Sequence, residues 1–488
     1  MKNIAKRLLK GDIILLSIVI LLMLTSLLVI FSSTGKLAYS EQGGNTWHYF
    51  FKQLGLCVSG LVIMWGMRFF SCRFLYNNAG KILLFAAGLV ACAAFAGKNI
   101  NGAGRWLPIP IIGSTFQPSE IAKIAVVLFS AKLLSKYQKA DQCSPEVLKF
   151  FWMPLMVIFL IFLDNFSTSI LIALVCLLMC WVGRVRGLLL LKWMGIGVGF
   201  IALVVVLGMT FPSVQKAGRI GTIVGRLVAW VDKDRDTDKG KNYNYQSDQA
   251  HIAVAKGGMT GCGPGNSIQR NFLPHPYSDF IYAIIIEEYG LVGGIFIFLL
   301  YTIILFRVGV IAHRTLKTEH LNNRGGPEIF PALVVIGLGV SIVLQAMFHM
   351  AVNVGALPVT GQTLPLVSMG GTSLWFVLAA LGIILNIAYS FSPEGLVEEN
   401  AKNPYKAKKH DFEKSDECED FENYTTEKYD RRRPTRRKKR GLDEGLDSEN
   451  FGEIDENGLS GLEEQLQEEG RTVLHELNRR GRRSGGLK

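Results

Sequence analysis

The sequence lacks the cysteine patterns that would stabilise a small secreted domain or hold a metal ion. Of its eight cysteines, Cys57, Cys92, Cys176 and Cys180 lie in long apolar runs, and no ligand-like spacing links the rest. No small-residue cleavage site follows the first apolar run, which we therefore interpret as a retained helix rather than a signal peptide. No internal repeat is evident. These absences exclude a disulfide-linked secreted domain and a cysteine-ligated metal module.

Long apolar runs dominate residues 1–392. The 488 residues are 49% hydrophobic, and the mean hydropathy is positive. Because a bilayer core about 30 Å thick requires roughly 20 helical residues, the pattern predicts an all-α polytopic membrane protein with about ten transmembrane helices. The third, fifth and sixth runs are short and could be tilted, broken or only partly spanning. The runs lie near residues 13–33, 51–70, 81–97, 118–135, 150–164, 167–183, 188–211, 280–307, 329–353 and 373–392.

Lysine and arginine are distributed unevenly between the two sides of the predicted membrane. They cluster at the N-terminus and in every second turn, whereas the turn at 354–372 carries no charge. Because positively charged loops remain in the cytoplasm, both termini are expected to be cytoplasmic. Much of the net charge of +12 follows from this topology, so we expect membrane lipids and no nucleic acid as partners.

The chain divides into four parts. Residues 1–211 carry helices 1–7, residues 212–278 form a large extracytoplasmic loop, and residues 279–392 carry helices 8–10. Residues 393–488 are polar and charge-blocked, which predicts a mostly disordered cytoplasmic tail. Its basic cluster, Arg431–Arg440, could dock on anionic lipid headgroups or simply be solvated.

The extracytoplasmic loop contains three recognisable segments. Arg219, Arg226 and Trp230 recur at a spacing compatible with an amphipathic helix on the membrane surface. The charge run Asp232–Lys241 is expected to be a solvated turn. The glycines of Gly257–Gly265 are expected to allow tight turns or close approach to a ligand backbone. A dinucleotide site is not expected here, because no predicted strand precedes the segment and it lies on the outer face.

Asp279 lies where this outer loop ends and an apolar helix begins. A carboxylate at that boundary could act on a substrate with its tail in lipid and its head in water. The helix macrodipole would keep the carboxylate ionised, and His275, Tyr277 and Ser278 provide polar neighbours. The alternative is a plain helix cap, because Ser and Asp are favoured at that position.

Four ionisable residues fall inside predicted spans, where charges are costly and usually face a cavity or a partner. Glu287 and Glu288 are expected about 12–13 Å deeper than Asp279, at about 1.5 Å rise per residue. Glu120 and Lys123 share one helix face at i and i+3. These residues could form structural ion pairs, or they could line one polar groove.

Two outward segments rich in glycine, proline and hydroxyl groups flank the predicted site, at Asn101–Glu120 and Asn353–Ser373. Non-helical backbone near membrane depth is tolerated only where it is buried in protein or lines a cavity. Arg105 could bind a phosphate group through paired hydrogen bonds. It could also anchor in lipid headgroups beside an interfacial tryptophan, Trp106.

Several motifs in these segments resemble the SEDS family of membrane proteins, the FtsW/RodA/SpoVE family. The similar stretches run in order over residues 12–392, and the tail lies outside them. They are Gly104-Arg105-Trp106, Phe116–Lys123 (FQPSEIAK), Gly265–Gln269 (GNSIQ), Asp279-Phe280 with Glu287-Glu288, and Asn353-Val354-Gly355 with Leu357–Gly361 (LPVTG).

The resemblance implies a bacterial inner-membrane peptidoglycan glycosyltransferase that polymerises lipid II at the outer face. A class B penicillin-binding protein would be its transpeptidase partner. Asp279 matches the family's essential aspartate and would activate the acceptor hydroxyl for attack on the donor's anomeric carbon, with inversion and loss of polyprenyl diphosphate. The leaving diphosphate needs positive charge from Arg105, Lys123, Arg219, Arg226 or a divalent cation such as Mg or Mn, and the sequence does not choose among them.

The expected substrate-binding set is wider than these cations. It also includes Trp106, Glu120, Gln269, Glu287, Glu288, Asn353 and Ser368. Three stretches depart from the family pattern. His275–Ser278 replaces an acidic residue followed by Ala-His-Thr, Leu163–Thr168 replaces Pro-Asp-x-Gly-Thr, and Ser368–Thr372 reads SMGGT instead of SYGGS.

The Gly-Asn-Ser-x-Gln run and the long tail favour the division branch (FtsW) over the elongation branch (RodA). A division role predicts a septal location and contacts with other division proteins. A lipid II flippase and a non-catalytic division scaffold are the alternatives. A flippase needs a polar route open to both faces, whereas the polar motifs cluster toward the outer side, which favours the enzyme.

Overall fold

The computed structural model describes residues 11–96, 98–100, 103–108, 115–139, 143–210, 238–322 and 329–392. The predicted disordered tail, its basic cluster, and the surface helix expected around Arg219 and Arg226 lie outside these ranges.

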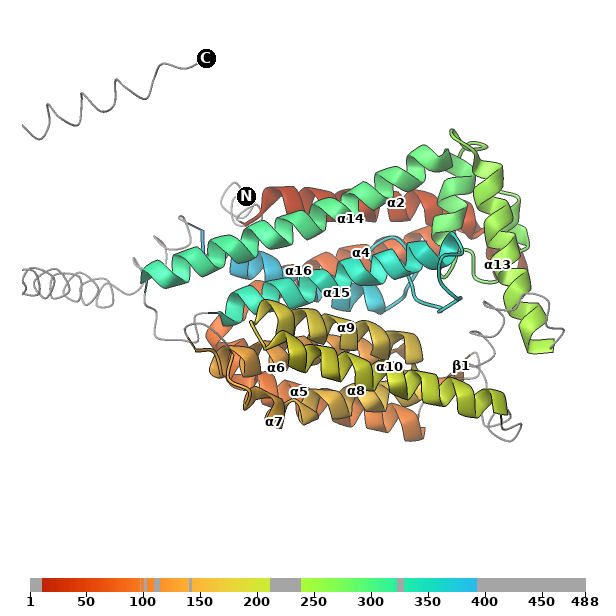
Figure 1. The fold of residues 1–488 in the computed structure, drawn as a ribbon. Coiled ribbons are helices and arrows are strands. Elements are labelled where there is room, and N and C mark those ends of the chain that lie inside the picture. Colours follow the sequence, from red (N-terminus) through yellow and green to blue (C-terminus); the bar gives the residue numbers. More distant parts are fainter. Residues whose placement is uncertain are drawn as a thin grey trace, which may run out of the picture. The chain divides into compact units, whose positions relative to one another are not determined.

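Helices occupy the positions of all ten predicted spans, which confirms the all-α multi-span class (Figure 1). Short elements connect several of them: α3 (Gly35–Gln42), η1 (Met67–Phe69), α7 (Val147–Phe150) and η2 (Gln269–Asn271). The ten are α2 (Ile13–Ser33), α4 (Thr46–Gly66), α5 (Cys72–Ala96), α6 (Pro118–Lys136), α8 (Trp152–Asp164), α9 (Phe166–Val182), α10 (Gly187–Thr210), α14 (Ile281–Asn322), α15 (Phe330–Asn353) and α16 (Ser373–Ser390).

Within the described ranges, six helices are long and apolar enough to cross a membrane, and α8, α9 and the described apolar part of α10 are shorter. The prediction that the fifth and sixth spans are short is confirmed, since α8 has 13 residues and α9 has 17. The prediction of a short third span is wrong, because α5 has 25 residues. Leu75 and Ala79 continue the buried stripe of Leu83 and Ala86 at helical spacing, which extends α5 toward its N-terminus.

α15 lies at the centre of the bundle and packs against α14, α16, α6 and α9. At the end of the bundle where α2 begins, Asp12 caps α2 by accepting a hydrogen bond from the Leu15 N–H at 2.9 Å. Its carboxylate also accepts hydrogen bonds from the Arg307 guanidinium of α14, with Nε 3.2 and 3.1 Å from the two oxygens. This ion pair joins the first helix to the eighth. The opposite end of the bundle carries Asp279, and we refer to it as the Asp279 end.

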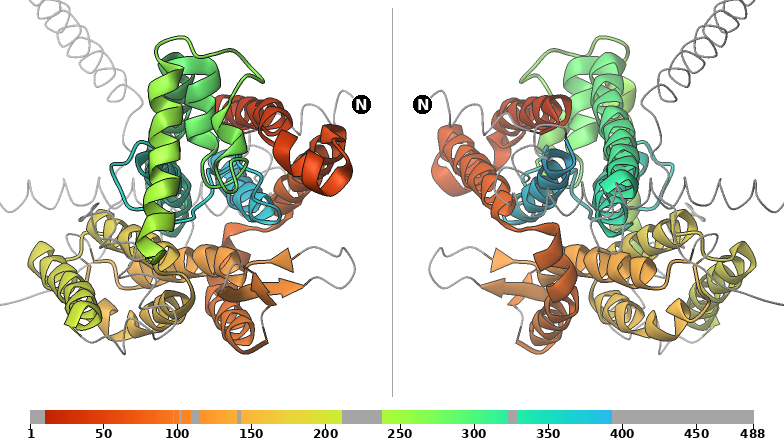
Figure 2. Two further views of the ribbon diagram at one scale, coloured as in Figure 1. Left: turned by 90° about the vertical axis from the view of Figure 1, so that its right-hand side faces the viewer. Right: turned by 90° about the vertical axis from the view of Figure 1, so that its left-hand side faces the viewer.

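A small antiparallel sheet at the Asp279 end links α5 to α6 (Figure 2). Its strands are β1 (Lys98–Ile100), β2 (Ala103–Pro108) and β3 (Thr115–Phe116). These strands were not predicted from the sequence. The Asn101-Gly102 dipeptide between β1 and β2, typical of tight hairpins, was the available signal.

Helix α13 (Asp238–Gly257) covers the Asp279 end, inside the stretch predicted to be a loop (Figure 1). It begins within the charge run Asp232–Lys241, so the expectation of a solvated turn there is wrong for residues from Asp238 onward. Ala250, Ala253 and Val254 pack at helical spacing on Phe280 and its neighbours. This narrow stripe of small side chains stabilises the helix although its composition is mostly polar.

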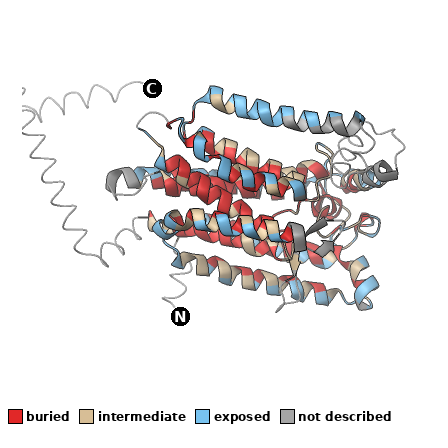
Figure 3. Cartoon of the chain, turned by 90° about the horizontal axis from the view of Figure 1, so that it is seen from below, coloured by how far each residue is buried: buried red, intermediate tan, exposed pale blue. Residues whose placement is uncertain are grey.

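Exposed residues lie on the outward faces of the bundle, whereas the buried residues concentrate between the helices (Figure 3). Many of the exposed residues are large and apolar. Leu28, Val62, Leu84 and Ile196 are each 60% exposed or more. Monomeric soluble proteins rarely expose apolar surface on this scale. The exposed faces therefore suit lipid rather than water.

Candidate functional site

Asp279 is half-buried and lies two residues before α14. Its Oδ1 accepts a hydrogen bond from the Ser278 hydroxyl at 3.1 Å, and its backbone carbonyl accepts one from Asn353 Nδ2 at 3.1 Å. A Cβ built on Gly361 would lie 3.7 Å from Asp279 Oδ2, so the carboxylate faces the backbone of the segment between α15 and α16. The residue at 361 is therefore one determinant of the space around this acid.

Asn353, at the C-terminal end of α15, holds the start of α14. Its Oδ1 accepts a hydrogen bond from the Ala283 N–H at 3.0 Å, and its Nδ2 also donates to the His349 carbonyl at 2.8 Å. The side chain is fully buried. Asn353 thus satisfies one of the backbone amides that a helix N-terminus leaves without an internal partner, and it fixes the backbone of Asp279 at the same time.

Ser368 ties the same segment to the residues before Asp279. Its hydroxyl donates to the Ser278 carbonyl at 2.8 Å and accepts from the Leu364 N–H at 2.8 Å. The Met369 N–H donates to the Tyr277 carbonyl at 2.9 Å. Residues 361–369 therefore lie beside Asp279 and the two residues before it. Met369 stands where the family pattern has a tyrosine, and it contributes a backbone N–H here rather than a phenol.

His275 and Tyr277, which replace the residues expected from the family, contact each other. His275 Nδ1 lies 3.2 Å from the Tyr277 hydroxyl, and His275 adopts a positive φ of 56°. Burial raises the pKa of Tyr277, and the Glu41 and Asp279 carboxylates raise it further. Glu41 belongs to α3 and accepts a hydrogen bond from the Tyr49 hydroxyl at 2.6 Å. Glu41 was not predicted as a neighbour of Tyr277, because the two residues are far apart in the sequence.

Glu120 and Lys123 form a buried ion pair at the start of α6, with Lys123 Nζ 2.8 Å from Glu120 Oε2. Lys123 also donates to Gln345 Oε1 of α15 at 2.8 Å. A cavity of about 20 Å³ lies beside these three side chains, which is room for about one water molecule. The predicted i, i+3 pair exists, and its further partner is Gln345.

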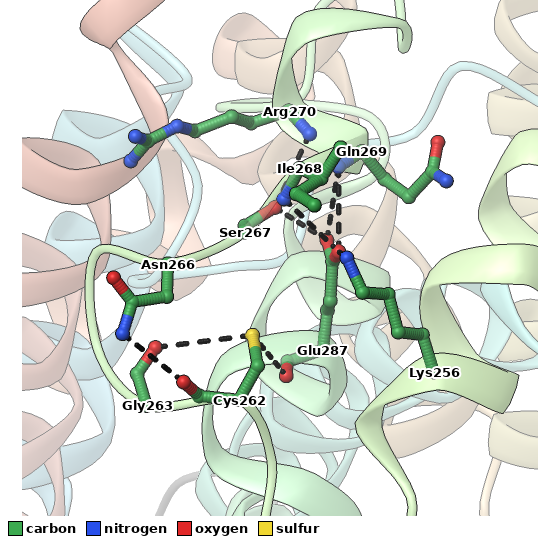
Figure 4. A network of polar contacts seen from close by, with 9 residues as sticks. All are labelled: Lys256, Cys262, Gly263, Asn266, Ser267, Ile268, Gln269, Arg270 and Glu287. Carbon is green, nitrogen blue, oxygen red and sulfur yellow. Dashed lines mark hydrogen bonds and ion pairs between the residues drawn. The ribbon is translucent and has the colours of Figure 1, made fainter.

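Glu287 organises the Gly-Asn-Ser-x-Gln segment rather than facing the helix bundle (Figure 4). The carboxylate is fully buried and accepts hydrogen bonds from the Ser267 hydroxyl and from the Ile268 and Gln269 N–H groups, at 3.1 and 3.3 Å for the two amides. Lys256 of α13 lies 3.6 Å away. Glu287 therefore fixes the backbone of Gln269, whose side-chain Oε1 is buried with no hydrogen-bond partner in the structure.

Glu288 lies next to a different group of residues. It accepts a hydrogen bond from the Ser32 hydroxyl of α2, and its Oε2 is buried with no hydrogen-bond partner in the structure. Arg270 Nη1 donates to the Ser32 carbonyl at 2.9 Å. Glu287 thus contacts η2 and α13, and Glu288 contacts the end of α2. The Glu120–Lys123 pair instead contacts α15.

The two glutamates do not lie within a straight membrane helix, because α14 bends directly after them at Gly290 (φ 71°, ψ −173°). The glycine-rich segment crosses this bend. Cys262 and Gly263 N–H donate to the Glu287 and Glu288 carbonyls at 3.0 Å each, and the Leu291 N–H donates to the Gly258 carbonyl at 2.9 Å. The bend lies beyond both glutamates, so their expected depth of about 12–13 Å below Asp279 stays a prediction.

Glycine is required where the two backbones meet. A Cβ on Gly257, Gly261 or Gly290 would collide with a backbone carbonyl of the facing segment. The sequence predicted tight turns or close approach to a ligand backbone here, and the backbone that these glycines approach in the structure is the chain's own. The Cys262 thiol donates to the Glu287 carbonyl at 3.1 Å, and burial followed by the Glu287 charge raises its pKa.

The side chains of some predicted site residues lie outside the described part of the structure. Arg105 and Trp106 are in β2, with no side-chain placement described, and Arg219 and Arg226 lie outside the described residues. In the described part of the chain, no three His, Cys, Asp or Glu side chains are close enough to share a metal ion. These residues do not by themselves form the divalent-cation site that the resemblance left open.

Two buried polar side chains of α15 were not predicted. Gln345 and His349 lie eight and four residues before Asn353 and are 4% and 1% exposed. Their spacing places all three on one helix face. The signal was present in the sequence, since polar residues repeated every fourth position in an apolar span usually face the protein interior.

Fold and site together define a multi-pass membrane protein with an acidic residue at a loop–helix boundary, held by the segment between two helices. The sequence model of the FtsW/RodA/SpoVE cell cycle proteins matches residues 12–392. The chain belongs to this family.

Similar proteins come from several bacteria. A probable peptidoglycan glycosyltransferase FtsW of Thiomicrospira cyclica is 33% identical over 388 residues, covering 78% of this chain and 92% of that protein. Stage V sporulation protein E of Bacillus subtilis is 29% identical, covering 77% and 96%.

Solved structures share the fold. One chain of a peptidoglycan synthase complex matches with a TM-score of 0.59 and 23% identity, covering 79% of this chain and 99% of that one. The rod shape determining protein RodA of Thermus thermophilus matches with a TM-score of 0.53 and 21% identity, covering 78% and 98%.

Proposed function

We propose that this chain is a peptidoglycan glycosyltransferase that polymerises lipid II at the outer face of the bacterial inner membrane. The observation that carries the proposal is the place of Asp279, half-buried at the loop–helix boundary beside a backbone segment matching the family motifs. Relatives named as probable FtsW glycosyltransferases support the activity. Both termini would then be cytoplasmic, as the charge distribution predicts.

In the proposed reaction Asp279 is the general base. It accepts the proton of the acceptor sugar hydroxyl as that oxygen attacks the anomeric carbon of the donor. The bond from the anomeric carbon to the diphosphate oxygen breaks, so the configuration inverts and polyprenyl diphosphate leaves with the bonding electron pair. Lys123 is connected through Gln345 to the segment facing Asp279 and is a candidate for stabilising the leaving charge.

The proposed partner is a class B penicillin-binding protein, and the proposed setting is the division septum with other division proteins. The fold match to a chain of a peptidoglycan synthase complex supports a partnered enzyme. The relatives named FtsW and the Gly265–Gln269 motif support the division role over elongation.

The test uses the purified full chain with its transpeptidase partner and labelled lipid II. Wild type should produce glycan polymer, and Asp279→Asn should produce none while retaining its melting temperature. Polymer from both proteins would overturn the role of Asp279. Absence of polymer from wild type, with lipid II flipping intact in liposomes, would favour a transporter. Loss of both activities would favour the scaffold.

A further inference from the structure

Three side chains on one face of α15 hold Asp279 and the loop that faces it. Gln345, His349 and Asn353 succeed each other at i, i+4 and i+8, and all three are buried. Asn353 bonds the Asp279 carbonyl, and the other two bond neighbouring residues of the loop. We call these three residues the α15 polar stripe.

Gln345 is a two-sided bridge. Its Oε1 accepts from the Lys123 ammonium at 2.8 Å, and its Nε2 donates to the Thr363 carbonyl at 3.0 Å. Lysine only donates and a carbonyl only accepts, so these partners fix the orientation of the amide. Only a side chain with both a donor and an acceptor at this reach joins the Glu120–Lys123 pair to the loop.

His349 forms the second bridge, one turn nearer to Asp279. Its Nδ1 donates to the Gln362 carbonyl at 2.8 Å, and Gln362 Nε2 donates to the Thr168 hydroxyl of α9 at 2.8 Å. Because a carbonyl only accepts, the proton of the imidazole is on Nδ1. The loop is thereby attached to α6, α9 and α15 within two consecutive residues, directly after Gly361.

We propose that Gln345 and His349 are positioning residues for the proposed glycosyl transfer, setting the place of Gly361–Thr363 relative to the Asp279 carboxylate. The inference rests on the proposed function. Neither side chain is assigned a contact with substrate. Gln345 acts through Lys123 and Thr363, and His349 acts through Gln362. Displacement of a reacting group by about 1 Å can cost on the order of 100-fold in rate, so small shifts of this loop have large kinetic consequences.

The chain provides matched variants. Gln345→Met keeps the length and removes both hydrogen bonds. Gln53→Met is its control, because Gln53 of α4 is a buried glutamine whose Nε2 donates to the Ser26 hydroxyl at 3.0 Å, among residues outside the site. His349→Gln keeps a donor that can reach the Gln362 carbonyl, whereas His349→Leu does not.

Two measurements on the full chain with its partner test the proposal. In lipid II polymerisation, we expect Gln345→Met and His349→Leu to lower kcat about tenfold or more, with KM within about twofold. His349→Gln and Gln53→Met should stay within about threefold of wild type. In hydrogen–deuterium exchange, peptides covering residues 357–370 should exchange faster in Gln345→Met than in wild type or Gln53→Met.

The outcomes distinguish failure of the positioning role from failure of the proposed function. If wild type polymerises lipid II but Gln345→Met matches Gln53→Met in kcat and exchange, the positioning role is overturned and the proposed function stands. If exchange rises but kcat does not change, the bridges are structural only and the positioning role is again overturned. If wild type makes no polymer, the proposed function itself fails, and the positioning role fails with it.

Discussion

Replacing Gly290 by alanine perturbs the bend that places Asp279 and the long segment of α14 on different axes. Gly290 has φ 71° and ψ −173°, a backbone region that is essentially restricted to glycine. A Cβ at this position would collide with the Met259 carbonyl. The facing segment cannot simply withdraw, because backbone hydrogen bonds hold it on both sides of the bend.

The magnitude follows from these two effects. The unfavourable backbone conformation costs roughly 1–3 kcal/mol. Loss of one or two of the hydrogen bonds across the bend adds about 1 kcal/mol each. We therefore expect Gly290→Ala to lower the free energy of unfolding by about 2–5 kcal/mol and to reduce lipid II polymerisation, because Asp279 lies at the start of the same helix.

The assay is thermal unfolding of the full chain, followed with a thiol-reactive dye. Cys57, Cys176 and Cys180 are buried, so they report loss of packing between the helices. Gly309→Ala is the matched control: it lies in the same helix, and a Cβ there meets no atom within 4 Å. Alanine favours helix over glycine by up to about 1 kcal/mol, so this control should unfold at the same or a higher temperature. Equal melting temperatures for Gly290→Ala and Gly309→Ala would refute the conclusion that the backbone contacts across the Gly290 bend stabilise the protein.

Two further predictions concern the neighbouring residues. Glu287→Gln should lower the free energy of unfolding by about 1–3 kcal/mol, because it weakens the buried acceptor of two backbone amides. Lys256→Met should lower it by less than about 1 kcal/mol, because that ammonium is partly exposed. Equal costs in thermal unfolding would indicate that the ion pair dominates. Because Tyr277 has a raised pKa, its contribution to stability is complete below the ordinary phenol pKa of about 10 and declines above it. Tyr277→Phe should therefore lose less stability than wild type between about pH 9 and 11, and parallel curves would contradict this expectation.

The ten helices were predictable because hydropathy is a local property. An apolar run of sufficient length folds as a helix in lipid whatever its neighbours are. The bend at Gly290 could not be predicted in this way. A hydropathy window passes over Gly290 without interruption, but the bend depends on Met259 and Gly261, which approach from a separate segment. Helix α13 was missed for a related reason, because its stability comes from Ala250 and Ala253 packing on Phe280 rather than from its composition.

The sequence indicates which polar residues are candidates for the site, but it does not indicate which residues they contact. Asn353, Ser368 and Glu287 were predicted to bind substrate, which stays a prediction. The contacts that the structure gives them are to backbone groups of other segments. Lys123 is separated from Gln345 by 222 positions. No periodicity in one sequence reports such a pairing. The polar residues at every fourth position of α15 indicate that this helix face is buried. They do not identify the residues that the face contacts.

The degree of burial decides which of the acidic residues can reach a substrate. Glu287 and Glu288 are at most 1% exposed, and Glu120 is 7% exposed and paired with Lys123. A general base must bring an oxygen within hydrogen-bonding reach of the substrate proton, about 2.6–3.2 Å. Asp279 is the acid among these four that is not buried, and it is also the one at the boundary between loop and helix. The other three instead hold the backbone and helices around it, which is why their substitution should affect stability before it affects the protonation step.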